Sequence, residues 1–207
     1  MNAFVDHVQY NELSSLGEVA FISHNQNVID IINGPIRDAF LKHAVHNAFC
    51  LYLQHHHHAI AAQETVVKVN GTAHLMHNED IKDITSCDNK VLPTTWMTTG
   101  DKLLPMECTV LPNDETYPEP SSAFVADFLT VLAVNGCTGL FCIDTLASSN
   151  WSEIKIGDAS VVVPSNDEER HDNDEFIPVA FAFDEKTPDF KVHGRCVVEH
   201  KHTTKPG

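Results

Sequence analysis

The sequence feature that most constrains the fold is an apolar segment, 49–53, that runs into four consecutive histidines, 55–58. The apolar part is typical of a core strand. Because side chains alternate along a strand, His55 and His57 are expected on one face and the other two histidines on the opposite face. Two imidazoles on one strand face can bind the same metal ion. The run lies inside the chain, unlike an expression tag. The competing interpretation is a polar strand end rich in histidine.

A second histidine pair, His200 and His202, follows the last predicted strand. We predict that these two side chains join His55 and His57 around one Zn²⁺ ion, which takes nitrogen, sulfur and oxygen ligands tetrahedrally. Copper also binds imidazole, so ligand type alone leaves it open. Cys196 is a substitute ligand, although a lone strand cysteine is usually a small buried hydrophobe. The alternative is a frayed tail that binds nothing.

Glu107 is the candidate catalytic residue, because it interrupts the apolar run 103–108. A buried glutamate without a partner has a raised pKa, which suits a general acid or base. The alternative is a glutamate on an edge strand that points into water.

The overall composition limits both the architecture and the partners. With 207 residues and 43% hydrophobic content, the chain suits a single domain over 1–207, with 1–18 and 201–207 loosely ordered. A formal net charge of −16 argues against nucleic acid and anionic membranes as partners. We find no apolar run of about 20 residues and no secretory signal. The six cysteines form no Cys-x-x-Cys pair, so we expect reduced thiols and a cytoplasmic location.

Short apolar runs separated by turn signals predict many short strands and few helices. Helices are predicted near 35–47 and from Ser121 or Ser122 to Asn135. The segment 77–90 is predicted to be a loop. The pattern favours an α+β fold with a mainly antiparallel sheet and two principal helices. The expected strands are 18–22, 49–58, 65–69, 72–76, 91–98, 102–111, 140–143, 152–156, 159–163, 176–183 and 191–199.

Several familiar catalytic motifs are absent from the sequence. It contains no Gly-rich phosphate loop, no dinucleotide fingerprint, no Gly-x-Ser-x-Gly elbow and no His-Glu-x-x-His helix. A metal site is therefore the constellation that the sequence favours.

The histidine run, the segment 67–72 (Val-Lys-Val-Asn-Gly-Thr) and the His-rich end resemble the cyclopenase group of small fungal, haemocyanin-like zinc proteins. This resemblance covers most of the chain. It implies a zinc-dependent lyase of alkaloid secondary metabolism. The chain lacks the paired helical His-x-x-x-His pattern of a dicopper site, which argues against oxygen chemistry.

The reaction implied by the resemblance is the ring contraction of a cyclopenin-type benzodiazepinedione epoxide to a viridicatin-type quinolone, with release of methyl isocyanate. Zinc would polarise an oxygen, and a carboxylate or imidazole would move protons. Trp96 or Phe49 would hold the aryl group. The expected partner is a small-molecule substrate, with a homo-oligomer left open. The alternatives are a structural zinc protein and a copper-dependent oxidase.

Overall fold

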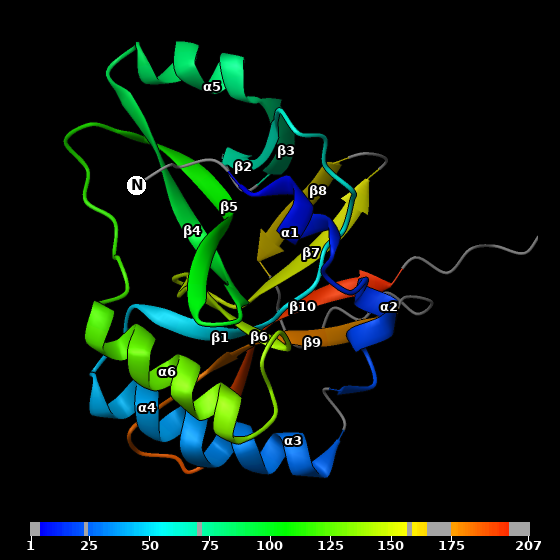
Figure 1. The fold of residues 1–207 in the computed structure, drawn as a ribbon, viewed down its shortest axis with the longest axis vertical. Coiled ribbons are helices and arrows are strands. Elements are labelled where there is room, and N and C mark those ends of the chain that lie inside the picture. The colour runs from blue at the N-terminus through cyan, green and yellow to red at the C-terminus, as the bar shows by residue number, and fades with distance from the viewer. Residues whose placement is uncertain (1–4, 23–24, 70–71, 157–158, 165–174, 199–207) are drawn as a thin grey trace, which may run out of the picture.

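In the part of the chain that the computed structural model describes (5–22, 25–69, 72–156, 159–164 and 175–198), ten strands form a closed barrel. Around the barrel their order is β1-β6-β4-β5-β2-β3-β8-β7-β10-β9 (Figure 1). The strands are β1 Phe49–Leu53, β2 Glu64–Val69, β3 Thr72–His77, β4 Asn89–Thr99, β5 Lys102–Pro112, β6 Phe141–Thr145, β7 Trp151–Ile156, β8 Ala159–Pro164, β9 Glu175–Ala182 and β10 Lys191–Val198.

The predicted α+β fold is therefore wrong, although most of the predicted strands are present. Strands adjacent in sequence pair as hairpins, such as β2 with β3 and β7 with β8. Closure comes from long-range pairs: β1 joins β9 with Leu51 opposite Phe181, and β2 joins β5 in parallel. Strand β10 also runs parallel to β7. Local sequence patterns specify the strands but not these distant pairings, so a closed barrel is easily mistaken for an open sheet.

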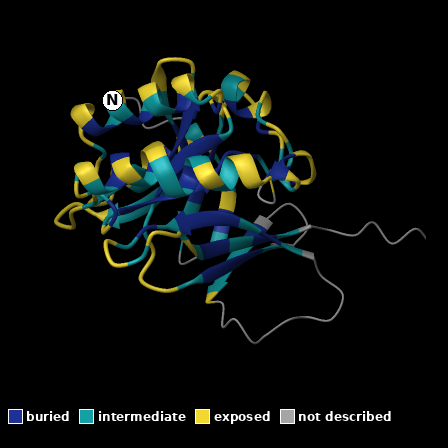
Figure 2. Ribbon diagram, turned by 90° about the horizontal axis from the view of Figure 1, so that it is seen from below, coloured by how far each residue is buried: buried dark blue, intermediate teal, exposed yellow. Residues whose placement is uncertain are grey.

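The helices lie outside the barrel, and Figure 1 shows α3, α4 and α6 together beneath β1 and β9. Figure 2 shows the strands largely buried, while the helices expose one face. The helices in the described part of the chain are all too short or too polar to cross a bilayer. Their bounds are α1 His7–Asn11, α2 Leu16–Val19, α3 Gln26–Ile31, the π-helical turn η2 Ile32–Ile36, α4 Arg37–Lys42, α5 Asn78–Thr85 and α6 Ser122–Val134.

Aromatic packing fixes the helical layer to the barrel. The Phe40 ring of α4 meets Phe124 of α6 edge-on at 5.0 Å, and it lies 4.9 Å from the Phe183 ring just after β9. Ser121 caps α6 by accepting a hydrogen bond from the backbone N–H of Phe124 at 3.3 Å. The predicted second helix is thus confirmed with its cap.

Other local predictions were less accurate. The helix predicted over 35–47 ends earlier, at Lys42. Gly34 has a non-helical backbone, so two helices meet there at a kink, and Pro35 directly follows it. The expected strand 18–22 overlaps α2, and the supposedly loose lead-in carries α1. The expected loop 77–90 contains α5, whose single buried residue gives little periodic signal.

Strand β2 shows how the barrel separates its two faces. Val67 packs outward with Ile81 of α5, Val91 and Cys108 in a small cluster. Because side chains alternate, its neighbour Lys68 points to the inside of the barrel. There it meets charged side chains of other strands, which are the subject of the next section.

Candidate metal centre

Two of the predicted histidines come together directly after β1. Strand β1 ends at Leu53, and Gln54 holds the following backbone by pairing with the backbone of Thr98 through both its amide oxygen and its amide nitrogen. The His55 and His57 Nε2 atoms then lie 3.2 Å apart. The predicted pairing of these imidazoles on one side is confirmed, although the strand itself ends earlier than expected.

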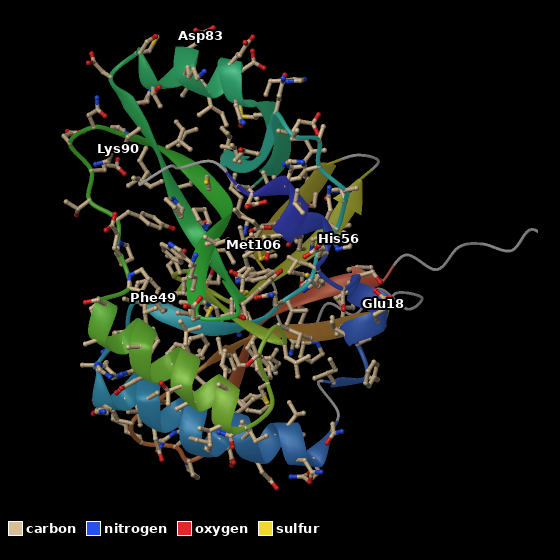
Figure 3. All side chains as sticks on the ribbon, in the orientation of Figure 1. Glu18, Phe49, His56, Asp83, Lys90 and Met106 are labelled. Carbon is tan, nitrogen blue, oxygen red and sulfur yellow. The ribbon has the colours of Figure 1, made fainter. Side chains whose placement is uncertain are left out.

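His56 is not part of this donor group. It forms an isolated bridge with Ser15, and its ring lies 6.1 Å from that of Tyr10 on α1. Figure 3 shows His56 beside α1, at the opposite end of the β1 segment from Phe49.

The barrel wall supplies a sulfur and a carboxylate next to the two histidines. Cys196 of β10 lies opposite Glu153 of β7 in the parallel register, so both side chains point to the same side. The Cys196 Sγ lies 3.7 Å from the Nε2 of His57. The Glu153 Oε2 lies 3.5 Å from the same nitrogen and 3.9 Å from the sulfur.

His55, His57 and Cys196 can hold a metal ion, since their ligand atoms all lie within 4.8 Å of one another. Ligands at about 2.05 Å (nitrogen) and 2.3 Å (sulfur) from a tetrahedral ion would be about 3.3 Å apart for N···N and about 3.6 Å for N···S. The observed 3.2 and 3.7 Å agree with these values. Two of the three donor pairs thus have the spacing of ligands on one ion, and the third pair lies within 4.8 Å.

The second nitrogen of His55 fixes which atom faces the site. Its Nδ1 lies 2.6 Å from the Leu53 carbonyl oxygen, a distance at which Nδ1–H donates. The Nε2 lone pair is left for the site, and such a contact is the usual support of a metal-binding histidine. Burial and the neighbouring His57 lower the pKa of His55 to about 3, so this imidazole is neutral at physiological pH.

His57 and Glu153 form a buried ion pair beside the Cys196 thiol. Burial lowers the pKa of His57, but the Glu153 carboxylate and the Cys196 sulfur outweigh burial and raise it well above its usual value. Burial opposes ionisation of Glu153, yet His57 and the Ser160 hydroxyl hold its pKa below the usual range. Burial raises the pKa of the Cys196 thiol. A proton on His57 therefore occupies the point where a cation would be bound.

The space beside this centre is small. A cavity of about 10 Å³ adjoins His57, Glu153 and Tyr10, close to the room that one water molecule needs. The Tyr10 ring of α1 is almost completely buried at this end of the barrel.

Glu107 is buried, at 3% exposure, but it has a partner. Its Oε2 lies 2.6 Å from the Lys68 ammonium and 3.2 Å from the Thr95 hydroxyl oxygen. The same hydroxyl lies 2.8 Å from the Oδ1 of Asp144. The predicted burial of Glu107 is thus confirmed, whereas the condition that it lacks a partner is not met.

His200 and His202 lie outside the described residues, so their part in the site stays a prediction.

Sequence reasoning missed two buried carboxylates, Glu153 and Asp144. Asp144 interrupts an apolar strand, which is the signal that identified Glu107, whereas Glu153 lies in the alternating strand β7 and gives no such signal.

Comparison with protein-family models, with curated proteins and with solved structures gave no match for this chain.

Proposed function

We propose that the protein binds zinc through His55, His57 and Cys196. The observation that carries the proposal is the spacing of the three donor atoms, at 3.2 and 3.7 Å from His57 Nε2. Zinc accepts imidazole and thiolate together and requires no redox partner. Copper shares these ligand preferences, so metal analysis has to separate the two ions.

We further propose that the zinc serves the lyase reaction implied by the cyclopenase resemblance. A cyclopenin-type epoxide would contract to a viridicatin-type quinolone and methyl isocyanate, a redox-neutral rearrangement. Bound zinc would supply a Lewis acid for a carbonyl or epoxide oxygen. Glu107 supports the proposal because its carboxylate adjoins the same small cavity as His57 and Glu153, and it can move a proton there.

A second candidate is a zinc ion that only stabilises the barrel. It is favoured by Glu153, whose Oε2 lies 3.5 Å from His57 Nε2 and 3.9 Å from Cys196 Sγ, near the position of a fourth ligand. Structural zinc sites are closed by four protein ligands, whereas catalytic sites keep one position open. The narrow space beside the centre also favours this candidate.

Metal content tests the ligand assignment. Elemental analysis of the untagged protein should give close to one zinc per chain, and His55→Ala, His57→Ala or Cys196→Ala should remove most of it. His56→Ala is the matched control, because this histidine lies in the same run but outside the donor group. Equal zinc loss in the His56 variant would contradict the assignment.

X-ray absorption at the zinc edge distinguishes the two candidates. Three protein ligands plus an exchangeable water indicate a catalytic site, and a fourth protein oxygen that disappears in Glu153→Gln indicates a structural one. Removing the residues after Val198 tests His200 and His202 as ligands. Full zinc retention in that truncated chain would exclude both of them.

Incubation with cyclopenin tests the reaction. Viridicatin and methyl isocyanate should form with the zinc-loaded protein, stop after chelation and return when zinc is restored. Glu107→Gln should keep the metal and slow turnover by roughly two to four orders of magnitude, the usual effect of losing general acid–base catalysis. Zinc binding without turnover would leave the structural candidate.

A further inference from the structure

A larger cavity lies at the other end of the β1 segment from the metal donors. It has a volume of about 210 Å³, and its walls include Lys68, Tyr117, Asp144, Trp151 and Val162. Asp144 pairs with Cys50 near the start of β1, whereas the histidines follow the end of that strand. An apolar cavity of about 150 Å³ can hold benzene, and drug-sized ligands need roughly 300 Å³ or more. The size therefore suits one aromatic ring with a small substituent.

One wall of this cavity is a rigid aromatic surface. The Trp151 indole stacks on the Tyr52 ring, with centroids 6.2 Å apart and planes at 28°. The indole also lies against Gly194, where a β-carbon would overlap it. By contrast, the tryptophan and phenylalanine predicted to hold an aryl group, Trp96 and Phe49, pack against each other at 5.8 Å, and neither is among the residues that line this cavity.

The charge on the cavity wall comes from Asp144. Lys68 is neutralised by Glu107, with the ammonium 2.6 Å from the carboxylate. Asp144 is only 5% exposed and receives a neutral partner, the Thr95 hydroxyl. Lys68, Glu107 and Asp144 together carry one negative charge when Asp144 is ionised. A carboxylate ligand would be repelled there, whereas an N–H donor or a cation would be attracted.

We propose that this cavity binds a small aromatic molecule that carries a cationic or amide N–H group. The N–H group donates to the Asp144 carboxylate, and the ring lies against Trp151. This site is separate from the metal centre and does not depend on the proposed reaction. The preference of the cavity for a cation or an N–H donor over a carboxylate depends on the Asp144 charge. Changing that charge therefore tests the proposal directly.

The protonation of Asp144 should control this preference. Burial raises the pKa of Asp144 to about 6, opposed by Lys68 and reinforced by Glu107. The other titratable groups that act on it are two phenols, Tyr52 and Tyr117, and two thiols, Cys50 of β1 and Cys142 of its own strand. Burial raises the pKa of all four, so they remain neutral at pH 7. Between pH 7.5 and 5, Asp144 is therefore the group on the cavity wall that changes charge.

Three probes of nearly equal size and different charge test the proposal: benzamidine (cation), benzamide (neutral) and benzoate (anion). Their binding to the full chain is measured by ligand-observed NMR and by calorimetry. At pH 7.5 we expect benzamidine to bind at least tenfold more tightly than benzoate, with benzamide between them. At pH 5, where Asp144 is mostly protonated, the advantage of benzamidine should fall about tenfold. This pH series uses the unaltered protein.

Asp144→Asn should abolish the preference for benzamidine at pH 7.5 and retain the binding of benzamide. Asp184→Asn is the matched control, because Asp184 is paired with Lys191 at the surface. Both variants should keep the metal content of the parent protein. Equal affinity for the three probes, or a charge preference that survives in Asp144→Asn, would overturn the proposal.

Discussion

The Lys68–Glu107 ion pair allows a quantitative test of the charged interior of the barrel. Lys68→Met keeps the length of the side-chain stem and removes the ammonium, which leaves the Glu107 carboxylate at 3% exposure with the Thr95 hydroxyl as its remaining partner. Breaking a buried ion pair on one side typically costs 3–5 kcal/mol. The variant can escape part of this cost by protonating Glu107.

The protonation route sets an upper limit on the loss. For a carboxyl with an ordinary pKa of about 4.3, protonation costs about 4 kcal/mol at pH 7 and about 1 kcal/mol at pH 5. A buried carboxyl that has lost its cationic partner is less favourable in the ionised form, so the unfolding free energy of Lys68→Met should fall as the pH increases through this range. We expect a loss of about 3–4 kcal/mol at pH 7 and of about 1 kcal/mol at pH 5.

Urea unfolding of three variants at both pH values provides the measurement. Lys68→Met/Glu107→Gln removes both charges and should regain most of the stability lost in Lys68→Met at pH 7. Glu107→Gln alone tests the reverse break, with Lys68 at 20% side-chain exposure able to reach solvent, so its cost should be smaller. If Lys68→Met is as stable as the double variant at pH 7, the ion pair is not buried as described.

Four further substitutions test other parts of the structure. Gly194→Ala should cost about 1–3 kcal/mol by overpacking against Trp151, whereas Gly17→Ala, with open space around it, should be neutral or stabilising in thermal melts. Asp144→Asn should stabilise the protein by about 3 kcal/mol at pH 7.5, since a pKa raised from 3.8 to about 6 penalises the ionised form. This gain should vanish below pH 4, and a pH-independent gain would contradict the assignment. Ser121→Ala should cost about 1 kcal/mol in urea unfolding through loss of the α6 cap.

The sequence predicted those features that depend on neighbouring residues. The hairpin of β2 and β3 follows from alternation and the Asn70-Gly71 turn signal, and α6 follows from its buried stripe and its cap. Barrel closure depends on pairs such as Leu51 with Phe181, which no local pattern encodes. For this reason correct strands gave a wrong fold class.

The candidate site divides in the same way. His55 and His57 are two residues apart, and their convergence could be predicted from strand alternation. Cys196 was recognised only as a substitute ligand, because its approach to His57 requires β10 to lie beside β7. Glu153 could likewise be recognised as a donor only once β10 was known to lie beside β7. Distant donors of this kind become visible only when the topology is known.

The separation of the metal donors along the chain has a consequence for how the protein matures. His57 and Cys196 are 139 residues apart, and β10 is the last strand in the described part of the chain. Contacts of such high sequence separation form late, because the loop between them must be ordered first. Synthesis from the N-terminus therefore exposes the histidine run long before its sulfur partner exists. Metal uptake should follow folding instead of nucleating it, so the bound metal would mark chains that have completed the barrel.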